Sequence, residues 1–182
     1  MSARLAVGGR QINRDRAVEF SFNGKRFKGF EGDTLASALL ANDQMLVGRS
    51  FKYHRPRGIV ASGPEEPNAL MNLGKGGRFE PNQRATTTEL FDGLTVTSQN
   101  HWPSLEFDVG AVNASLSRFL PAGFYYKMFI HPRPMWKHVY EPIIRHSAGL
   151  GKAPTEGDAD TYEHHYASVS YTHLTLPTIL LV

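Results

Sequence analysis

The sequence of 182 residues contains no cysteine. This absence excludes disulfide bonds, thiolate metal ligands and a cysteine nucleophile from the chain. No hydrophobic run approaches the length that a transmembrane helix needs. The polar residues at the amino terminus also lack the apolar stretch of a signal peptide. The expected location is therefore the cytoplasm.

Motifs of common catalytic sites are missing as well. The sequence has no glycine-rich dinucleotide-binding motif, no phosphate-binding loop with its Lys-Ser/Thr pair, and no serine nucleophile elbow. His164 and His165 are adjacent, so their side chains project in different directions and would form a poor chelate. His131 and His138 are not one helical turn apart. We therefore predict neither catalytic residues nor a metal site.

Composition places the chain among soluble globular proteins, with 41% hydrophobic and 20% charged residues. The net charge of +3 permits nucleic-acid binding but is too small to argue for it. Residues 1–17 are polar and carry several arginines. We expect them to form a flexible, basic arm.

A β-hairpin is predicted after the arm. Hydrophobic and polar side chains alternate over residues 18–22, which is the pattern of a half-buried strand. Asn23 and Gly24 follow, and both tolerate the positive φ of a tight hairpin turn. The return strand is therefore expected over residues 25–30.

A helix is predicted next, over residues 34–41, because its leucines and alanines form an apolar stripe. Asp33 is the expected N-cap, since its carboxylate can accept the free amides of the first turn. Asn42 is expected to end the helix in the left-handed conformation. Residues 46–47 are a candidate short strand.

A second hairpin is predicted further along the chain. Residues 80–82 indicate a turn, and the β-branched threonines favour a strand over residues 85–91. A turn at Asp92-Gly93 then leads to a return strand over residues 94–97. Because strands and helix are segregated rather than alternating, we expect an α+β domain of the β-grasp kind over residues 18–99.

The segment of residues 100–152 is rich in aromatic side chains and is predicted to be mainly helical. One helix is expected after a cap at Asp108. Another is expected from Pro134, with a kink or division at Pro142. Such short helices offer too little surface to cover their own aromatic rings. We therefore expect this extension to pack on something outside the chain.

The candidate site is the stretch from Gly48 to Leu73, whose start interleaves basic and aromatic residues. Its prolines and glycines disfavour a helix, and long loops of this kind are usually functional or disordered. Two interpretations stay open: a solvated basic loop, and a site for an anion or a partner, since arginine suits phosphate and carboxylate. The acidic pair 65–66 is expected to be a solvated turn or to pair with arginines. The predicted cofactor or partner contacts are Arg49, Lys52, Arg55 and Arg57.

The stretch RSFKYHRPRGIVASGPEEPNAL resembles the amino-terminal part of the alpha subunits of heterotetrameric sarcosine oxidases. The resemblance includes GFEGDTLASALLAN upstream. Downstream it includes FEPNQRATTTELFDGL, SQNHWPSLEFDVGAVN, FLPAGFYYKMFIHP and VYEPIIRHSAGLG. It extends from about Gly8 to about Tyr166.

The resemblance implies a ferredoxin-like domain of the 2Fe-2S type. It also implies a part in an enzyme that oxidatively demethylates sarcosine to glycine, yields hydrogen peroxide and passes a one-carbon unit to tetrahydrofolate. That complex carries FAD, FMN and NAD, and the partners are the rest of the alpha subunit and the beta, gamma and delta subunits. Relatives with an iron–sulfur cluster hold it by cysteines after an arginine-rich stretch like residues 55–58. No cofactor is therefore expected in this fragment.

The carboxyl-terminal part departs from the resemblance. Residues 153–167 are predicted to be a polar linker, and residues 168–182 look like a non-native tail. The chain is thus interpreted as a structural and interface fragment that is inactive alone. The alternative is a free-standing, cluster-less β-grasp module that binds another protein. Weak nucleic-acid binding comes last, because the basic residues do not extend into a broad stripe.

Overall fold

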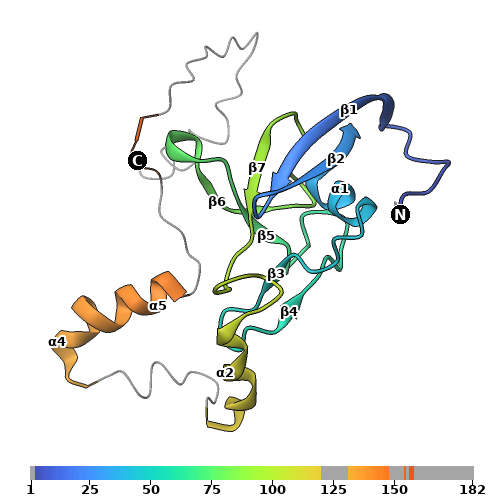
Figure 1. The fold of residues 1–182 in the computed structure, drawn as a ribbon. Coiled ribbons are helices and arrows are strands. Elements are labelled where there is room, and N and C mark those ends of the chain that lie inside the picture. Colours follow the sequence, from blue (N-terminus) through green and yellow to red (C-terminus); the bar gives the residue numbers. More distant parts are fainter. Residues whose placement is uncertain (1–2, 120–130, 148–153, 155, 158–182) are drawn as a thin grey trace, which may run out of the picture.

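The structure is a computed structural model that describes residues 3–119, 131–147, 154, 156 and 157. Its centre is a five-stranded mixed sheet accompanied by one helix, and a two-stranded sheet lies beside it (Figure 1). The elements of this part are β1 Asn13–Phe22, β2 Lys25–Glu31, α1 Leu35–Ala41, β3 Gly48–Arg49, β4 Pro56–Arg57, β5 Leu70–Leu73, η1 Gly76–Arg78, β6 Glu80–Arg84 and β7 Leu94–Thr97.

The first hairpin forms as predicted. Strands β1 and β2 pair antiparallel with Phe20 opposite Phe27. Asn23 and Gly24 have φ values of 50° and 80°, which a tight hairpin turn requires. Strand β1 nevertheless starts at Asn13, inside the segment expected to be a flexible arm, and its first residues are exposed. The alternation of the sequence marked only the half-buried part of the strand.

The sheet has the order β2-β1-β7-β5-β6. Strand β7 pairs in parallel with β1, with Phe20 beside Leu94, and antiparallel with β5. The parallel pair joins strands far apart in sequence, and the chain between them contains α1. A mixed sheet with a single accompanying helix fits the expected α+β, ferredoxin-like class.

Two details of the helix prediction are wrong. The N-cap of α1 is Thr34, whose hydroxyl accepts from the Ser37 amide, while Asp33 is buried and bonds elsewhere. Asn42 ends the helix with φ −96°, and the positive φ of 61° falls on Asp43 instead. The cap is displaced because the carboxylate of Asp33 has a stronger partner, the guanidinium of Arg4 at 2.5 Å.

The predicted strand over residues 85–91 is also wrong, as is the predicted turn over residues 80–82. Strand β6 occupies Glu80–Arg84 and pairs with β5. Beyond it, Thr87 and Thr88 belong to no strand, and their hydroxyls donate to the Arg84 carbonyl at 3.3 and 2.7 Å. Threonine competes for backbone partners in this way, so a β-branched run folds as turns.

The Asp92-Gly93 turn exists but does not close a second hairpin. Asp92 accepts from the Glu19 amide at 2.9 Å, and the Gly93 amide donates to the Glu19 carbonyl at 2.8 Å. The turn therefore attaches the start of β7 to β1. This contact sets up the parallel pair in place of the hairpin that local sequence favours.

The hydrophobic core lies between the sheet and α1 and includes Leu105, which follows β7 in the sequence and is 1% exposed. The largest of its fully buried apolar side chains are Leu35, Leu39, Val47, Met71, Val96 and Leu105. The start of the predicted extension is thus part of the domain core.

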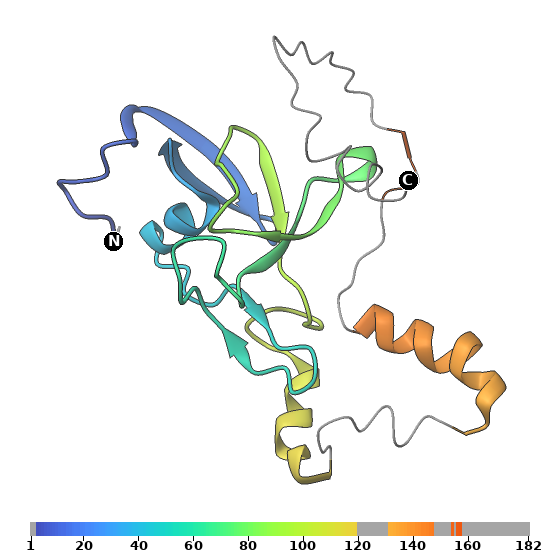
Figure 2. The same ribbon diagram turned by 180° about the vertical axis from the view of Figure 1, so that it is seen from behind.

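After a non-helical stretch over residues 98–108, the described chain is mainly helical, and its helices extend away from the sheet (Figures 1 and 2). Pro142 is the second residue of α5, and α5 directly follows the π-helical turn η4, where the missing proline amide disturbs the regular helix. The elements are η2 Val109–Ala111, α2 Val112–Ser115, η3 Ser117–Phe119, α4 Arg133–Met135, the π-helix η4 Trp136–Tyr140 and α5 Glu141–Ser147.

None of the helices within the described residues has the length and apolar character needed to cross a membrane. Most of the predicted linker (153–167) and the whole predicted tail (168–182) lie outside the described residues.

Candidate functional site

The basic stretch is folded rather than a long open loop. Strands β3 and β4 pair antiparallel, with Arg49 opposite Pro56, and Leu46–Val47 precedes the strand instead of forming it. The turn between the strands is tied by Ser50, whose carbonyl accepts from the His54 amide and whose hydroxyl accepts from the Arg55 amide, both at 2.9 Å. This small hairpin decides which basic side chains face inward.

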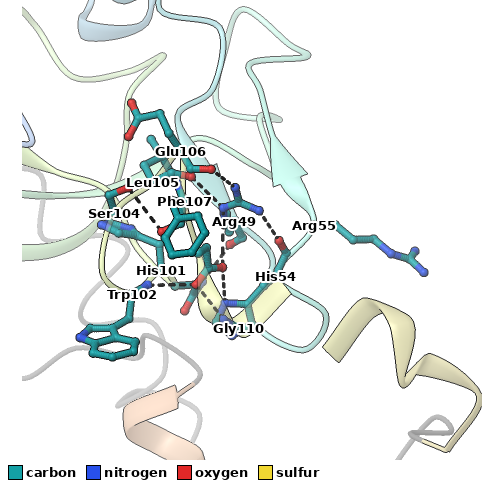
Figure 3. A network of polar contacts seen from close by, with 12 residues as sticks. Arg49, His54, Arg55, His101, Trp102, Ser104, Leu105, Glu106, Phe107 and Gly110 are labelled. Carbon is teal, nitrogen blue, oxygen red and sulfur yellow. Dashed lines mark hydrogen bonds and ion pairs between the residues drawn. The ribbon is translucent and has the colours of Figure 1, made fainter. Parts of the chain in front are cut away.

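Arg49 faces inward, and its side chain is 8% exposed. Its guanidinium donates to the carbonyls of Leu105 at 2.8 Å, Glu106 at 3.1 Å and His54 at 2.9 Å (Figure 3). Arg49 thereby fastens the basic hairpin to the chain beyond β7. The sequence predicted an anion or partner contact for Arg49, and the structure gives its guanidinium three carbonyl partners within the chain.

Asp108 is the centre of the same network and is buried. One carboxylate oxygen accepts from the amides of Trp102 at 3.0 Å and Gly110 at 3.1 Å. The other lies 2.7 Å from Nδ1 of His54 and 3.6 Å from Nε of Arg49. The predicted cap at Asp108 is confirmed, because it accepts from Gly110 at the start of η2. Its link to the basic hairpin was not foreseen.

The pKa of Asp108 reflects these contacts. Burial opposes its ionisation, but the Trp102 amide, His54 and the Gly110 amide outweigh that effect and hold the pKa below its usual range. The carboxylate is therefore ionised at neutral pH. Gly110 also allows His54 to approach, since a Cβ at this position would collide with the imidazole ring.

The remaining basic residues are more accessible. Lys52 Nζ lies 4.7 Å and Arg55 Cζ 4.8 Å from the centre of the Tyr53 ring, so both cations gather on one aromatic side chain. Arg55 is exposed and points away from the Asp108 network (Figure 3). Arg57 is also exposed and donates to the side-chain carbonyl of Asn68.

A cleft of about 450 Å³ lies between the hairpin and the ends of the central strands. Gln99 organises part of its wall by donating to Asn72 at 2.8 Å and Asn82 at 2.7 Å. The cleft is lined by Gly48, Arg49, Ser50, Phe51, Arg57, Pro67, Asn68, Leu70, Asn82, Gln99 and Asn100. Of the four predicted contact residues, the structure brings Arg49 and Arg57 to this cleft, and Lys52 and Arg55 to Tyr53.

Glu66 departs from the expectation of a solvated acidic turn. It is 1% exposed and accepts from four backbone amides. Burial opposes its ionisation, but these amides outweigh that effect and lower its pKa. The prolines and glycine around it, which bend the chain back on itself, were the only sequence signal for such a site.

Comparison with known proteins places these features in a family context. Residues 15–101 match the family described as the 2Fe-2S iron-sulfur cluster binding domain. The chain is 61% identical over 156 residues, or 86% of its length, to a sarcosine oxidase subunit alpha from Rhizobium meliloti. The predicted resemblance to sarcosine oxidase alpha subunits is confirmed.

A second curated alpha subunit and one solved structure also match parts of the chain. A sarcosine oxidase subunit alpha from Corynebacterium sp. strain U-96 is 43% identical over 100 residues, or 53% of the chain. The chain spans only 16% of the Rhizobium alpha subunit and 10% of the Corynebacterium one. The crystal structure of an L-proline dehydrogenase from P. horikoshii aligns over 50% of this chain and 17% of its own, with 27% identity and a TM-score of 0.40.

The residues do not fit the cluster that the matching family is named for. Iron–sulfur clusters are held by cysteine thiolates, with histidines replacing only some of them in certain centres, and this sequence has no cysteine. Among the described residues, no group of three His, Asp or Glu side chains is placed to hold a metal ion. The site offers two cations on an aromatic ring, a buried carboxylate–imidazole–guanidinium network and an amide-lined loop.

Proposed function

We propose that this chain is the amino-terminal, non-catalytic scaffold of a sarcosine oxidase alpha subunit. The observation that carries the proposal is the 61% identity over most of the chain to an alpha subunit of which the chain spans 16%. In the complete cytoplasmic enzyme, sarcosine would be demethylated to glycine with hydrogen peroxide as a product and one-carbon transfer to tetrahydrofolate. FAD, FMN and NAD would be held by other parts of the complex, and the fragment alone would be inactive.

An exposed apolar strip after β7 supports an interface role. Trp102, Phe107 and Phe119 are 70%, 70% and 73% exposed. Further apolar side chains are exposed along η2 and α2, namely Val109, Val112 and Leu116. Several large apolar side chains exposed along one short segment favour an interface there. We assign the remainder of the alpha subunit as its occupant, because the relatives continue far beyond the length of this chain.

The basic hairpin forms the second part of the proposed interface. Lys52 and Arg55 present two cations next to Tyr53, and Arg57 is exposed nearby. Through Arg49 and Asp108 the hairpin is held against the segment that carries the apolar strip. The proposed ligand of the cations is an anionic group, either a flavin phosphate or an acidic surface of the beta, gamma or delta subunit.

The test uses the full-length alpha subunit coexpressed with its beta, gamma and delta partners. The variant Arg55→Glu/Arg57→Glu should reduce the yield of assembled complex or its flavin content per complex. The control Arg26→Glu/Arg84→Glu makes the same charge change at exposed residues of β2 and β6 and should assemble normally. Unchanged assembly and flavin content in the first variant would refute the basic contact.

The alternative, a free-standing interaction module, can be distinguished from the scaffold proposal with the isolated chain and the oxidase subunits. The isolated 182-residue chain should show no turnover of sarcosine. Copurification with the other subunits is expected for the full-length alpha subunit that contains this segment and not for the isolated chain. An isolated chain that oxidises sarcosine would contradict the scaffold proposal. One that binds an acidic protein while ignoring the oxidase subunits would favour the module.

A further inference from the structure

The loop between β4 and β5 closes around a carboxylate of its own. Oε2 of Glu66 accepts from the amides of Val60 at 2.8 Å and Ala61 at 2.6 Å. Oε1 accepts from the amides of Asn68 at 2.7 Å and Ala69 at 3.2 Å. Both arms of the loop therefore donate to the same buried side chain.

The charge of Glu66 is balanced by amide dipoles. Within the described residues no lysine or arginine forms an ion pair with it, and its side chain is 1% exposed. A buried anion without a cation is stable only where several donors converge on it. Concave groups of backbone amides of this kind bind anions, including phosphates and iron–sulfur clusters.

The loop that carries these amides lies in the part of the chain that matches an iron–sulfur domain family. This match covers residues 15–101, in a chain without a single cysteine. We propose that the Glu66 carboxylate is the built-in anion of this amide nest and holds the loop closed in place of a thiolate-bound cluster. The nest is thus a site for one carboxylate group, and in this chain the Glu66 side chain supplies that group.

The closed loop is joined to the domain core. Ala69, which donates to Glu66, is fully buried, and its carbonyl accepts from the Ala85 amide at 2.9 Å. Thr86 donates to the Gly63 carbonyl at 2.7 Å on the other side of the loop. Opening the nest would therefore disturb the packing of this region on α1 as well as the loop itself.

The test compares adjacent glutamates in the full 182-residue chain by thermal unfolding at neutral pH. Glu66→Gln places an amide group among four donors, so we expect the melting temperature to fall by about 10 °C. Glu65 is the matched control, because it is exposed and accepts one amide, from Gly63 at 3.1 Å. Glu65→Gln should shift the melting temperature by about 2 °C or less.

A second variant tests the anion site directly. Glu66→Ala removes the carboxylate from the nest. Formate should then raise the melting temperature of this variant increasingly with formate concentration, whereas chloride at equal ionic strength should not. Formate should leave Glu65→Ala and the wild type unchanged. If Glu66→Ala is unfolded, formate should restore its folded circular dichroism spectrum.

Two results would overturn the proposal. One is an equal loss of melting temperature in the Glu66→Gln and Glu65→Gln variants. The other is a formate effect on Glu66→Ala that chloride reproduces, or no effect, whether the variant starts folded or unfolded. Neither readout depends on the sarcosine oxidase assignment, so failure here leaves the proposed function to its own test.

Discussion

Replacing Asp108 by asparagine is the sharpest way to separate the basic hairpin from the segment beyond β7. The substitution keeps the shape of the side chain and removes its charge. One oxygen can still accept from the amides of Trp102 and Gly110, which lie 3.0 and 3.1 Å away. The other position becomes an uncharged NH₂ group facing Nδ1 of His54, so the contact with a carboxylate at 2.7 Å is lost and His54 can bond to the side chain only if its Nδ1 accepts.

The magnitude follows from what is lost and what is kept. A hydrogen bond to a charged group contributes about 1.5–3 kcal/mol. The contact with Arg49 at 3.6 Å is lost as well, but Arg49 keeps its three carbonyl partners and is not left unpaired. We therefore expect the free energy of unfolding to fall by about 3 kcal/mol. With a urea dependence of about 2 kcal/mol per M, the midpoint would move by roughly 1.5 M.

The assay is urea unfolding of the 182-residue chain together with amide hydrogen exchange. Exchange should accelerate most at the amides of Trp102 and Gly110, which donate to the carboxylate. The matched control is Asp15→Asn, on an exposed part of β1, where we expect a change within about 0.5 kcal/mol. An Asp108→Asn midpoint equal to that of the control would refute the view that this carboxylate joins the two segments.

Three other results are expected from the same structure. Arg4→Ala should lower the free energy of unfolding by about 2 kcal/mol in urea, because it leaves the buried carboxylate of Asp33 without its cation but with two other donors; a change below about 0.5 kcal/mol would contradict this. Gly110→Ala should cost about 1–3 kcal/mol by forcing the His54 ring aside, and combining it with Asp108→Asn should add little, whereas full additivity would show that the two act separately. The free energy of unfolding should also fall as the pH drops below about 5, because carboxylates with lowered folded pKa values stabilise the fold above their unfolded pKa and lose that contribution on protonation; a flat profile from about pH 6 to 3 would contradict it. The carboxylates concerned are Asp33, Glu66 and Asp108.

Local sequence patterns predicted the elements whose contacts are local. The hairpin from β1 to β2 follows from alternation and an Asn-Gly turn, and α1 follows from its apolar stripe. The parallel pairing of β1 with β7 could not be read in this way. It depends on a turn at Asp92 that bonds to Glu19, which is distant in the sequence. The same nonlocal contact is why the expected second hairpin does not form.

The candidate site was only partly predictable for a related reason. A run of arginines indicates positive charge, but it does not show which guanidinium meets a carbonyl across the fold. Two of the three carbonyl partners of Arg49 come from residues 105 and 106, and the side-chain partner of His54 is Asp108. Glu66 was misassigned because an acidic residue among prolines is usually a solvated turn. Its four amide partners come together only when the loop is folded.

The three buried carboxylates share one structural task. Each one accepts from at least one backbone amide and at the same time fixes a segment outside the regular strands. Asp33 holds the amino-terminal arm through Arg4, Glu66 closes the loop before β5, and Asp108 holds the segment after β7. A domain with one helix and a small apolar core has few hydrophobic contacts with which to fix such segments. Charge-assisted hydrogen bonds to fixed amides do so without requiring more core. They also leave Arg55 and the apolar strip exposed, where the proposed interface needs them.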